Sequence, residues 1–508
     1  MKRLIPVLIT VCVLCLIFIF FPKSSNNKVD ISSLDDLNGL TVGMQNGLNY
    51  DLILKEQCPD AEPILFNDFT SMNQSLLQGK ISALLTESVS FPTDKIEHPS
   101  FTAIDGSLDK VGNHLILKDD SRGHALASQI NEYIAAYAED GTRDELFSYW
   151  VTNYDRGNVS VDKSGITGEN GVLTFTAEAG YEPACFAGND GELIGFDVDF
   201  IYHFCREYGY EPNIIPLEYD AMSAAVVSGR CDAAIGIVKD DEREEALFFT
   251  DAYFYYDVIA VYNGDDVESG SFFDNLRTGF SKTFIRENRW KMFLEGFETT
   301  LVIAILAVIF GSGLGLLLYL WCLHGKEAEK KFTNGMCWLM SSTPTILLLM
   351  MLYYIVFSKY ALSNVTIAVI GFTLQFGCSF YERIVSGVKA VGIGQAEAAI
   401  SQGFSKNQTF FRIQFPQAKK FFMDAYEGDV ISLILETSVV GYITVMDLTK
   451  MSDLVRSRTY EPFFPLMATT LIYFLLIWLM TVLVRRLSVL LDKSGRMSKA
   501  SLEKLRDE

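Results

Sequence analysis

The stretch GQAEAAISQGFSKNQTFFRIQFPQA, residues 394–418, places charged and polar residues inside a long apolar part of the chain. Its first part predicts a helix that ends at Gly403. Ser405 followed three positions later by Gln408 is the pattern of a capping box, which begins a second helix. We expect Pro416 to end that second helix. The stretch therefore predicts a polar knob of two short helices between apolar segments; an ordinary amphipathic loop is the alternative.

Apolar runs lie on both sides of this knob. A membrane-spanning helix needs about 20 apolar residues, and five runs of this kind occur in the second half of the chain: Thr299–Trp321, Met336–Phe357, Val365–Val385, Val430–Met446 and Phe463–Val484. A sixth run, Leu4–Phe21, follows Lys2 and Arg3. We expect it to be an uncleaved anchor because no small-residue cleavage pattern follows it; a cleaved signal peptide is the alternative.

Basic residues predict how these spans are oriented. The loop after Trp321 contains three lysines, and short lysine-rich loops stay in the cytoplasm. Alternation then places the knob and the C-terminal tail in the cytoplasm. It places the half of the chain between the anchor and the second span outside the cell.

The outer half is strongly acidic. Between Asp30 and Asp266 there are 43 acidic and 13 basic residues, whereas the rest of the chain has 20 acidic and 29 basic residues. This charge argues against nucleic acid and anionic membrane surfaces as partners of the outer half. The nine cysteines and five histidines are scattered without metal-ligand spacing, so we expect no metal, no cofactor and no particular disulfide.

The knob closely resembles the EAA loop of ABC importer permeases. The matching residues are Gly394, Gln395, Glu397, Ala398, Ala399, Gly403, Pro416, Gln417 and Ala418. In that family the loop docks into a separate ATPase subunit, so the resemblance implies an ATPase-coupling role for Gly394, Glu397, Ala398, Ala399 and Gly403. It extends over Phe293–Leu487, which includes STP (Ser342–Pro344) and ETS (Glu436–Ser438), and points to the polar-amino-acid branch.

The resemblance also implies partners. The chain contains no G-x-x-x-x-G-K-[ST] phosphate loop, so ATP hydrolysis is expected from a partner ATPase. Five core spans imply a second permease copy, hence a two-fold pore in a homodimer. Glu382 lies inside a predicted span, where a carboxylate is costly, and we expect it on the translocation path. The alternative is a helix-end residue at the inner interface. The sequence also departs from the family here, because Val385 occupies the family's arginine position.

The acidic half contains two α/β segments. Gly171–Asn263 predicts strands that alternate with helices, and Leu34–Tyr154 has a predicted strand at Lys80–Glu87 and ends in helices. Such alternation predicts a parallel sheet with a ligand site at the carboxyl ends of its strands.

Both segments resemble family 3 extracellular solute-binding proteins, which capture polar amino acids. The family's first lobe is matched by GELIGFDVDF (Gly191–Phe200) and DDEREEALFFTDAYF (Asp240–Phe254). Its second lobe is matched by LNGLTVGMQNG (Leu37–Gly47), and its closing helix by EDGTRDELFSYW (Glu139–Trp150). Lobe two precedes lobe one here, so we expect one circularly permuted domain; two tandem domains are the alternative.

The resemblance implies a role for each residue of the cleft. Arg243 stands at the carboxylate-binding arginine, whose planar fork suits a bidentate pair. Glu87 matches the acidic residue that receives the α-ammonium group. The remaining matches are aromatic positions that stack on the ligand, Tyr181 and Tyr219, and cleft-lining positions, Asn49 and Gly236.

Other cleft positions depart from the family. Its serine or threonine donors are replaced by Leu48, Val238 and Asp240. A carboxylate at Asp240 lowers the affinity for a ligand carboxylate unless a cation intervenes, so either the ligand is cationic or the pocket is altered. The alternative for Arg243 is a surface ion pair with Asp240 or Glu244.

The predicted fold class is therefore an extracellular α/β bilobed domain of the type II periplasmic-binding-protein kind, circularly permuted, followed by an all-α membrane permease domain with five core spans. The predicted function is the membrane subunit of an ABC importer for a polar amino acid in the cell membrane; a ligand-gated channel or a non-transporting amino-acid receptor is the alternative. We expect no enzymatic activity. The predicted divisions are the anchor 1–23, lobe two with the closing helix 32–155, a linker 156–170, lobe one 171–264, a linker 265–292, the permease 293–487 and a cytoplasmic tail 488–508.

Overall fold

The computed structural model describes residues 31–153, 159–188, 192–264, 272–358, 360, 362–459 and 463–491. The predicted anchor, residues 156–158 and 265–271 of the predicted linkers, and residues 492–508 of the predicted tail lie outside this description.

The chain divides into two compact units. Unit 1 runs to Val111 and resumes at Tyr255–Glu268; unit 2 consists of Gly112–Phe254 and the chain from Ser269 onward. The chain therefore passes from one unit to the other inside two strands, β5 (Asp109–Lys118) and β12 (Phe254–Asn263).

Unit 1 is a small α/β layer. Its central strand β1 (Thr41–Gln45) pairs in parallel with β2 (Glu62–Phe66) and with β3 (Ala83–Glu87). β12 pairs antiparallel with β3 and with β4 (Phe101–Ala103). The helices are η1 (Leu34–Leu37), α2 (Tyr50–Gln57), α3 (Phe69–Leu77) and α4 (Phe91–Glu97). Apolar side chains such as Met72, Leu84 and Val261 form its core.

The α/β part of unit 2, residues 112–254, contains a mixed sheet. β6 (Val172–Glu178) pairs in parallel with β9 (Glu211–Leu217) and with β10 (Ala233–Val238). β5 pairs antiparallel with β10 and with β11 (Leu247–Phe249). The predicted parallel sheet is therefore correct for the strands that alternate with helices, and wrong for β5 and β12, which run antiparallel to their neighbours where the chain changes units.

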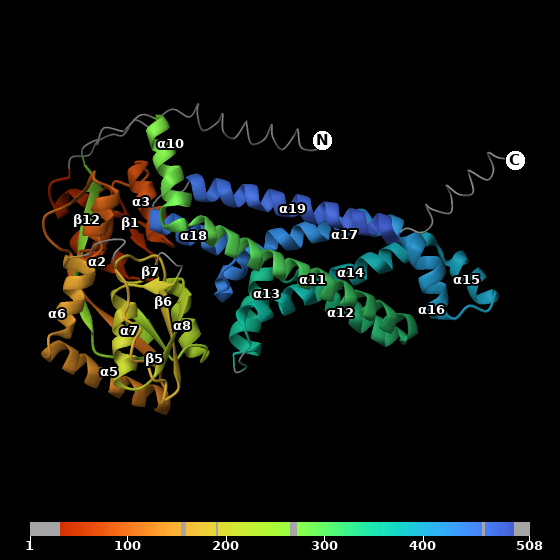
Figure 1. The fold of residues 1–508 in the computed structure, drawn as a ribbon, viewed down its shortest axis with the longest axis horizontal. Helices are drawn as coiled ribbons and strands as arrows, with labels where there is room; N and C mark the ends of the chain where they lie inside the picture. Colours follow the sequence, from red (N-terminus) through yellow and green to blue (C-terminus); the bar gives the residue numbers. More distant parts are fainter. Residues whose placement is uncertain are drawn as a thin grey trace. The chain divides into compact units, whose positions relative to one another are not determined.

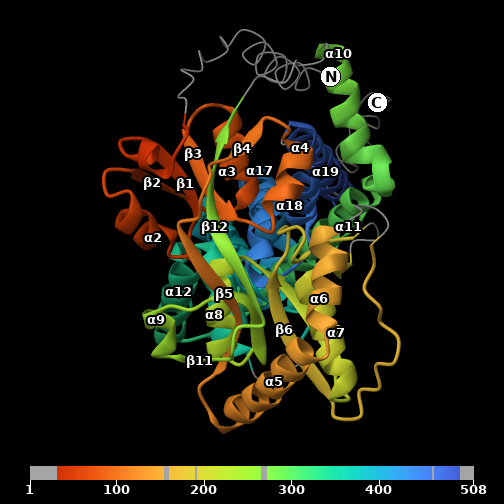
Figure 2. The ribbon, with the colours of Figure 1, turned by 90° about the vertical axis from the view of Figure 1, so that its left-hand side faces the viewer.

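Helices cover both faces of this sheet. α7 (Phe196–Glu207) and α8 (Tyr219–Val227) lie on opposite sides of β6 (Figures 1 and 2). The other elements are the short antiparallel pair β7 (Phe186–Ala187) and β8 (Leu193–Ile194), and the helices α5 (Ser121–Glu139), α6 (Thr142–Phe147), η2 (Ser148–Thr152) and α9 (Asp241–Glu244).

The core of the α/β part joins segments from both sides of residues 156–170. Tyr133, Tyr137 and Trp150, from α5 and η2, are buried with Phe175 and Phe200, from β6 and α7. The Trp150 indole N–H also donates to the Asp199 carboxylate at 2.9 Å. Residues before and after the predicted linker thus share one hydrophobic core.

The helical part of unit 2 follows. Its elements are α10 (Phe272–Phe280), η3 (Ser281–Ile285), η4 (Arg286–Asn288), α11 (Trp290–His324), α12 (Glu327–Ser342), α13 (Thr345–Met351), η5 (Leu352–Val356), α14 (Asn364–Val391), α15 (Ile393–Ser401), α16 (Lys406–Thr409), η6 (Phe410–Gln414), α17 (Phe415–Glu436), η7 (Thr437–Ile443), α18 (Leu448–Thr459) and α19 (Phe463–Leu491).

Among the described residues, three helices are long and apolar enough to cross a membrane: α11, α14 and α19. Two further helix pairs pass the same test but are bent, by 104° between α12 and α13–η5 and by 58° before α18, which gives up to five spans if each pair is one span. The run Met336–Phe357, predicted as one span, therefore contains a sharp bend. Pro344 lies at the bend and cannot donate a helical hydrogen bond there.

Candidate functional site

The α/β part of unit 2 pairs Arg243, the residue predicted to bind a ligand carboxylate, with Asp240. Asp240 caps α9: its carboxylate accepts from the Arg243 backbone N–H at 2.9 Å, and its other oxygen lies 2.9 Å from the Arg243 Nη1. The two side chains are only 17% and 11% exposed. The ion pair considered as the alternative for Arg243 is thus present, but it is largely buried rather than on the surface.

Arg243 is also held by neutral groups. Its Nη1 donates to the Val238 carbonyl at 3.2 Å and lies 3.4 Å from the Tyr219 hydroxyl, and the guanidinium sits 5.1 Å from the centre of the Tyr219 ring. Asp240 therefore fixes the guanidinium beside Tyr219, and a ligand carboxylate at this place has to share Arg243 with Asp240.

The two predicted aromatic positions differ in exposure. Tyr219 is 4% exposed, and its hydroxyl accepts from the Val238 N–H at 3.0 Å. Burial raises the pKa of Tyr219 to about 12, so it stays protonated. Tyr181 is half-buried in a tight turn, where its backbone exchanges two hydrogen bonds of 2.8 Å with Cys185. Tyr219 thus supports Arg243, while Tyr181 presents part of its ring.

Gly236 lies in a bulge of β10. The pairing with β5 shifts between Ile235 and Ile237, and Gly236 has a φ of +80°, which favours glycine. A Cβ there would lie 3.2 Å from an Asp197 carboxylate oxygen. The absence of a side chain at Gly236 therefore allows the buried Asp197 carboxylate to approach the backbone closely.

Asp197 has no predicted role, although it lies within the matched stretch GFDVDF. It is buried in the first turn of α7, and the Tyr253 hydroxyl donates to its carboxylate at 2.6 Å. Burial raises its pKa to about 6, against the lowering effect of the Tyr253 hydrogen bond. The sequence signal was an aspartate flanked by apolar residues, which by itself does not separate a surface residue from a buried one.

In unit 1, Glu87 and Asn49 lie at the ends of elements. Glu87 is the last residue of β3 and is buried. Asn49 precedes α2 with a φ of +56°, a left-handed conformation in which its carbonyl accepts from the Leu52 N–H at 3.1 Å. Leu48 beside it is buried. Glu87 thus ends strand β3 and Asn49 follows strand β1, so both lie toward the carboxyl ends of strands, where α/β sheets bind ligands.

The knob has the predicted turn. α15 ends at Ser401, Gly403 has a φ of +88°, and the Ser405 hydroxyl and Gln408 side chain form the predicted capping box at 3.3 and 2.9 Å. Pro416, however, does not end the second helix. It lies in the first turn of α17, where a missing N–H costs little, and η6 joins α16 to α17 without a break.

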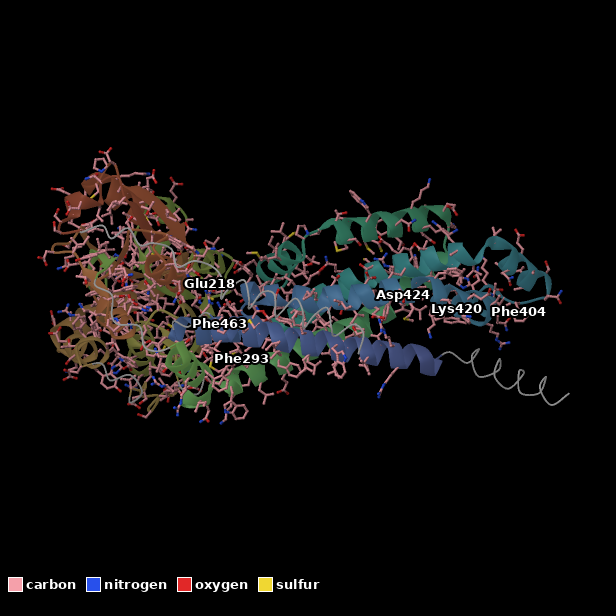
Figure 3. All side chains as sticks on the ribbon, turned by 90° about the horizontal axis from the view of Figure 1, so that it is seen from above. Glu218, Phe293, Phe404, Lys420, Asp424 and Phe463 are labelled. Carbon is pink, nitrogen blue, oxygen red and sulfur yellow. The ribbon has the colours of Figure 1, made fainter. Side chains whose placement is uncertain are left out.

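The knob exposes a mixed surface. Gly394, Glu397, Ala398 and Gly403 are exposed, whereas Ala399 is buried. Two isoleucines beside them, Ile393 and Ile400, are 76% and 53% exposed. Phe404 of the knob and Glu218 of the α/β part lie at opposite ends of the helical part (Figure 3).

The helical part has a polar cavity that is partly open rather than enclosed. Its lining combines α12, α14 and α17: Ser341, Phe372, Gln375, Phe376, Ser379, Asp429, Ser432, Leu433 and Glu436. Glu382, predicted for the translocation path, is exposed on α14 and is not part of this lining. Its neighbour Arg383 instead forms a two-pronged pair with Asp429, with both distances at 2.9 Å.

Fold and site together define a membrane protein that joins a two-unit solute-binding domain to a helical permease-like part. The model of the bacterial extracellular solute-binding proteins, family 3, matches residues 173–434, and the chain belongs to this family. The match begins at β6 and continues into α17.

The chain is also similar to amino-acid ABC permeases. A Rickettsia bellii protein assigned as the glutamine transport system permease GlnP is 30% identical over 196 residues, which are 38% of this chain and 89% of that protein. The histidine/lysine/arginine/ornithine transport system permease HisM of Salmonella typhimurium is 26% identical over 225 residues, 40% of this chain and 94% of that protein. A crystal structure of an amino acid ABC transporter with histidines is 24% identical, covers 44% of this chain and 99% of its own, and has a TM-score of 0.36.

Proposed function

We propose that this chain is the membrane subunit of an ABC importer that captures a polar amino acid outside the cell and moves it inward, driven by a separate ATPase. One observation carries the proposal: a family 3 solute-binding domain and a permease-like helical part with an exposed EAA-type knob occur in the same chain. Capture and translocation are therefore functions of one polypeptide. ATP is used by the partner subunit, not by this chain.

The binding domain is proposed to be circularly permuted. Segments 112–153 and 172–254 share one core, which favours a single domain over two tandem ones. Residues 159–170 lie against α7: the Arg206 guanidinium donates to the Ser164 carbonyl at 2.8 Å and to the Asp162 carbonyl at 2.5 Å. A linker held in this way acts as a joint between the family's natural ends.

Ligand recognition is proposed to use the residues whose roles the family resemblance implies. Arg243 receives the ligand carboxylate, Glu87 its ammonium group, and Tyr181 packs against its side chain. Because Asp240 already neutralises much of the Arg243 charge, the pocket favours a ligand that brings a second cation. This reasoning supports lysine or arginine over a neutral amino acid as the ligand.

Coupling is proposed to occur at the knob. Gly403 sets the turn between its helices, and the exposed Ile393 and Ile400 supply apolar area for a cleft on the ATPase. Two copies of the chain form the pore as a homodimer. In this arrangement the solute-binding domain is extracellular, and the knob and the C-terminus are cytoplasmic.

Uptake into proteoliposomes tests the proposal. The full chain, reconstituted with the ATPase that copurifies with it, is expected to accumulate radiolabelled lysine or arginine only when ATP is supplied on the knob side. Amino-acid flux without ATP points to a channel, and binding without any uptake points to a receptor. Either result overturns the importer assignment.

A further inference from the structure

A short segment of the helical part touches the polar cavity with its first turn. In this segment, α13 and η5 (residues 345–356), the Thr345 hydroxyl lies 2.9 Å from the Gln375 side-chain oxygen and 2.8 Å from a Glu436 carboxylate oxygen. Gln375 and Glu436 both line the cavity. The first turn of α13 is thereby fastened to the cavity wall.

The other end of the segment is held by the α/β part. Arg230, in the turn after α8, donates to the Asn364 side-chain oxygen at 2.6 Å and to the Phe357 carbonyl at 3.4 Å. Its guanidinium also lies 4.0 Å from the centre of the Tyr353 ring, within cation–π range. One arginine of the α/β part thus grips the end of η5 and the start of α14.

The contacts of Asn364 extend to the bend between η7 and α18. Asn364 donates to the Thr444 hydroxyl, which also lies 3.4 Å from the Tyr353 hydroxyl. Thr444 has a φ of +60°, a left-handed conformation at the end of η7. Arg230 is therefore connected to the ends of three helical segments through side chains in direct contact.

The α/β part also contacts the helical part at a second place, through an ion pair and apolar packing. Glu218, just before α8, forms an ion pair with Lys450 in α18 (Glu218 is labelled in Figure 3). Ala179, just after β6, packs on the cluster that contains Met292, Phe293 and Leu448. The α/β part thus rests on α18 and α11 and reaches η5 with Arg230.

We infer that α13–η5 is a gate lever, and that Arg230 is the positioning residue through which the α/β part moves it. The segment has 12 residues, so at 1.5 Å per residue it is about 18 Å long. Tilting of the α/β part about its support on α18 pulls the Arg230 end of the lever and breaks the Thr345 contacts at the cavity. This inference rests on the proposed function, because it names the step that links ligand capture to opening of the path.

Hydrogen–deuterium exchange of the full chain in nanodiscs tests the lever without any ligand. Arg230→Ala is expected to raise amide exchange about tenfold in η5 and also in Leu348–Met351, toward the cavity end. Arg230→Lys keeps the charge but loses the planar guanidinium, so its amide exchange should be intermediate between the parent and Arg230→Ala. The matched control is Arg122→Ala, which removes an exposed arginine paired with Asp232. Unchanged exchange in Leu348–Met351 of Arg230→Ala overturns the inference, because a purely local role would alter η5 alone.

Cysteine labelling tests the gate itself. Ser379→Cys places a thiol on the cavity wall, and a membrane-impermeant methanethiosulfonate is the probe. Thr345→Val removes the hydroxyl contacts and is expected to raise the labelling rate about tenfold with no ligand present. Adding lysine or arginine should raise labelling in the parent chain but not in Arg230→Ala.

The two arms separate the two claims. If neither amino acid affects the parent chain, while Thr345→Val still raises labelling and Arg230→Ala still loosens Leu348–Met351, the lever stands and the proposed ligand class fails. The lever is wrong if lysine or arginine raises the labelling rate in Arg230→Ala as much as in the parent. It is also wrong if the cavity thiol is labelled at the parent rate in Thr345→Val.

Discussion

Asp197→Asn is expected to stabilise the solute-binding domain at neutral pH, contrary to the usual effect of changing a buried hydrogen-bonded residue. Asp197 is buried, accepts a 2.6 Å hydrogen bond from Tyr253, and has a pKa of about 6, raised by burial from 3.8. Because the folded chain holds the proton more tightly than the unfolded chain, stability falls as the pH rises from about 4 to about 6.

The size of the effect follows from the pKa difference. The pKa of Asp197 is higher by about 2 in the folded chain, and a pKa difference of 1 corresponds to about 1.36 kcal/mol. Ionisation of Asp197 therefore costs about 3 kcal/mol of folding free energy. Asparagine keeps an oxygen for Tyr253 but never ionises. The variant and the parent should therefore be equally stable near pH 4, and the variant should be more stable by up to about 3 kcal/mol above pH 7.

Urea unfolding of the Ser32–Gly264 fragment measures this difference. Trp150 is the only tryptophan in the fragment and is fully buried, so its fluorescence reports the relevant core. The control is Asp162→Asn. Backbone and side-chain hydrogen bonds from Ser164 lower the pKa of Asp162. This variant should therefore be less stable than the parent at neutral pH and equally stable at acidic pH, where Asp162 is protonated. A stability difference for Asp197→Asn that does not change between pH 4 and pH 7 refutes the reasoning.

Three further predictions concern the domain, the pocket and the knob. The Ser32–Gly264 fragment should unfold in one cooperative transition, whereas residues 32–154 alone should fail to fold, because the core partners of Trp150 are absent; cooperative melting of the shorter piece, followed by circular dichroism, supports tandem domains instead. Asp240→Thr releases Arg243 from its ion pair and should strengthen binding of neutral amino acids relative to lysine and arginine, measured by calorimetry; an unchanged ratio means that Asp240 does not face the ligand. Gly403→Asp places a side chain at a φ of +88° in the knob and should leave ligand binding intact while abolishing ligand-stimulated ATPase activity; normal stimulation argues against docking at the knob.

Local patterns in the sequence predicted much of the fold. The strands β6 and β10 lie within Gly171–Asn263, where strands alternating with helices were predicted, because apolar and β-branched residues stand in short blocks between helical patterns. The turn at Gly403 and the capping box after it depend on neighbouring residues only, so they too were predictable.

Features that depend on packing were not predictable. Pro416 is compatible with either the end or the first turn of a helix, and only the continuity of η6 with α17 decides between them. The partner of Arg383 depends on how α14 packs against α17, which brings in Asp429 from 46 residues away. The burial of Asp197 likewise results from the sheet and helices that surround it.

The shared core of the α/β part has a consequence for synthesis on the ribosome. Trp150, Tyr133 and Tyr137 leave the ribosome well before β10 and Tyr253, which help to cover them, since about 100 residues separate Trp150 from Tyr253. At translation rates of about 5–20 residues per second, their apolar surface stays uncovered for about 5–20 seconds. During this time the apolar residues of α5 and η2 lack their later core partners, so we expect depletion of a holdase chaperone to lower the yield of this chain more than that of a binding protein in which lobe one is made first.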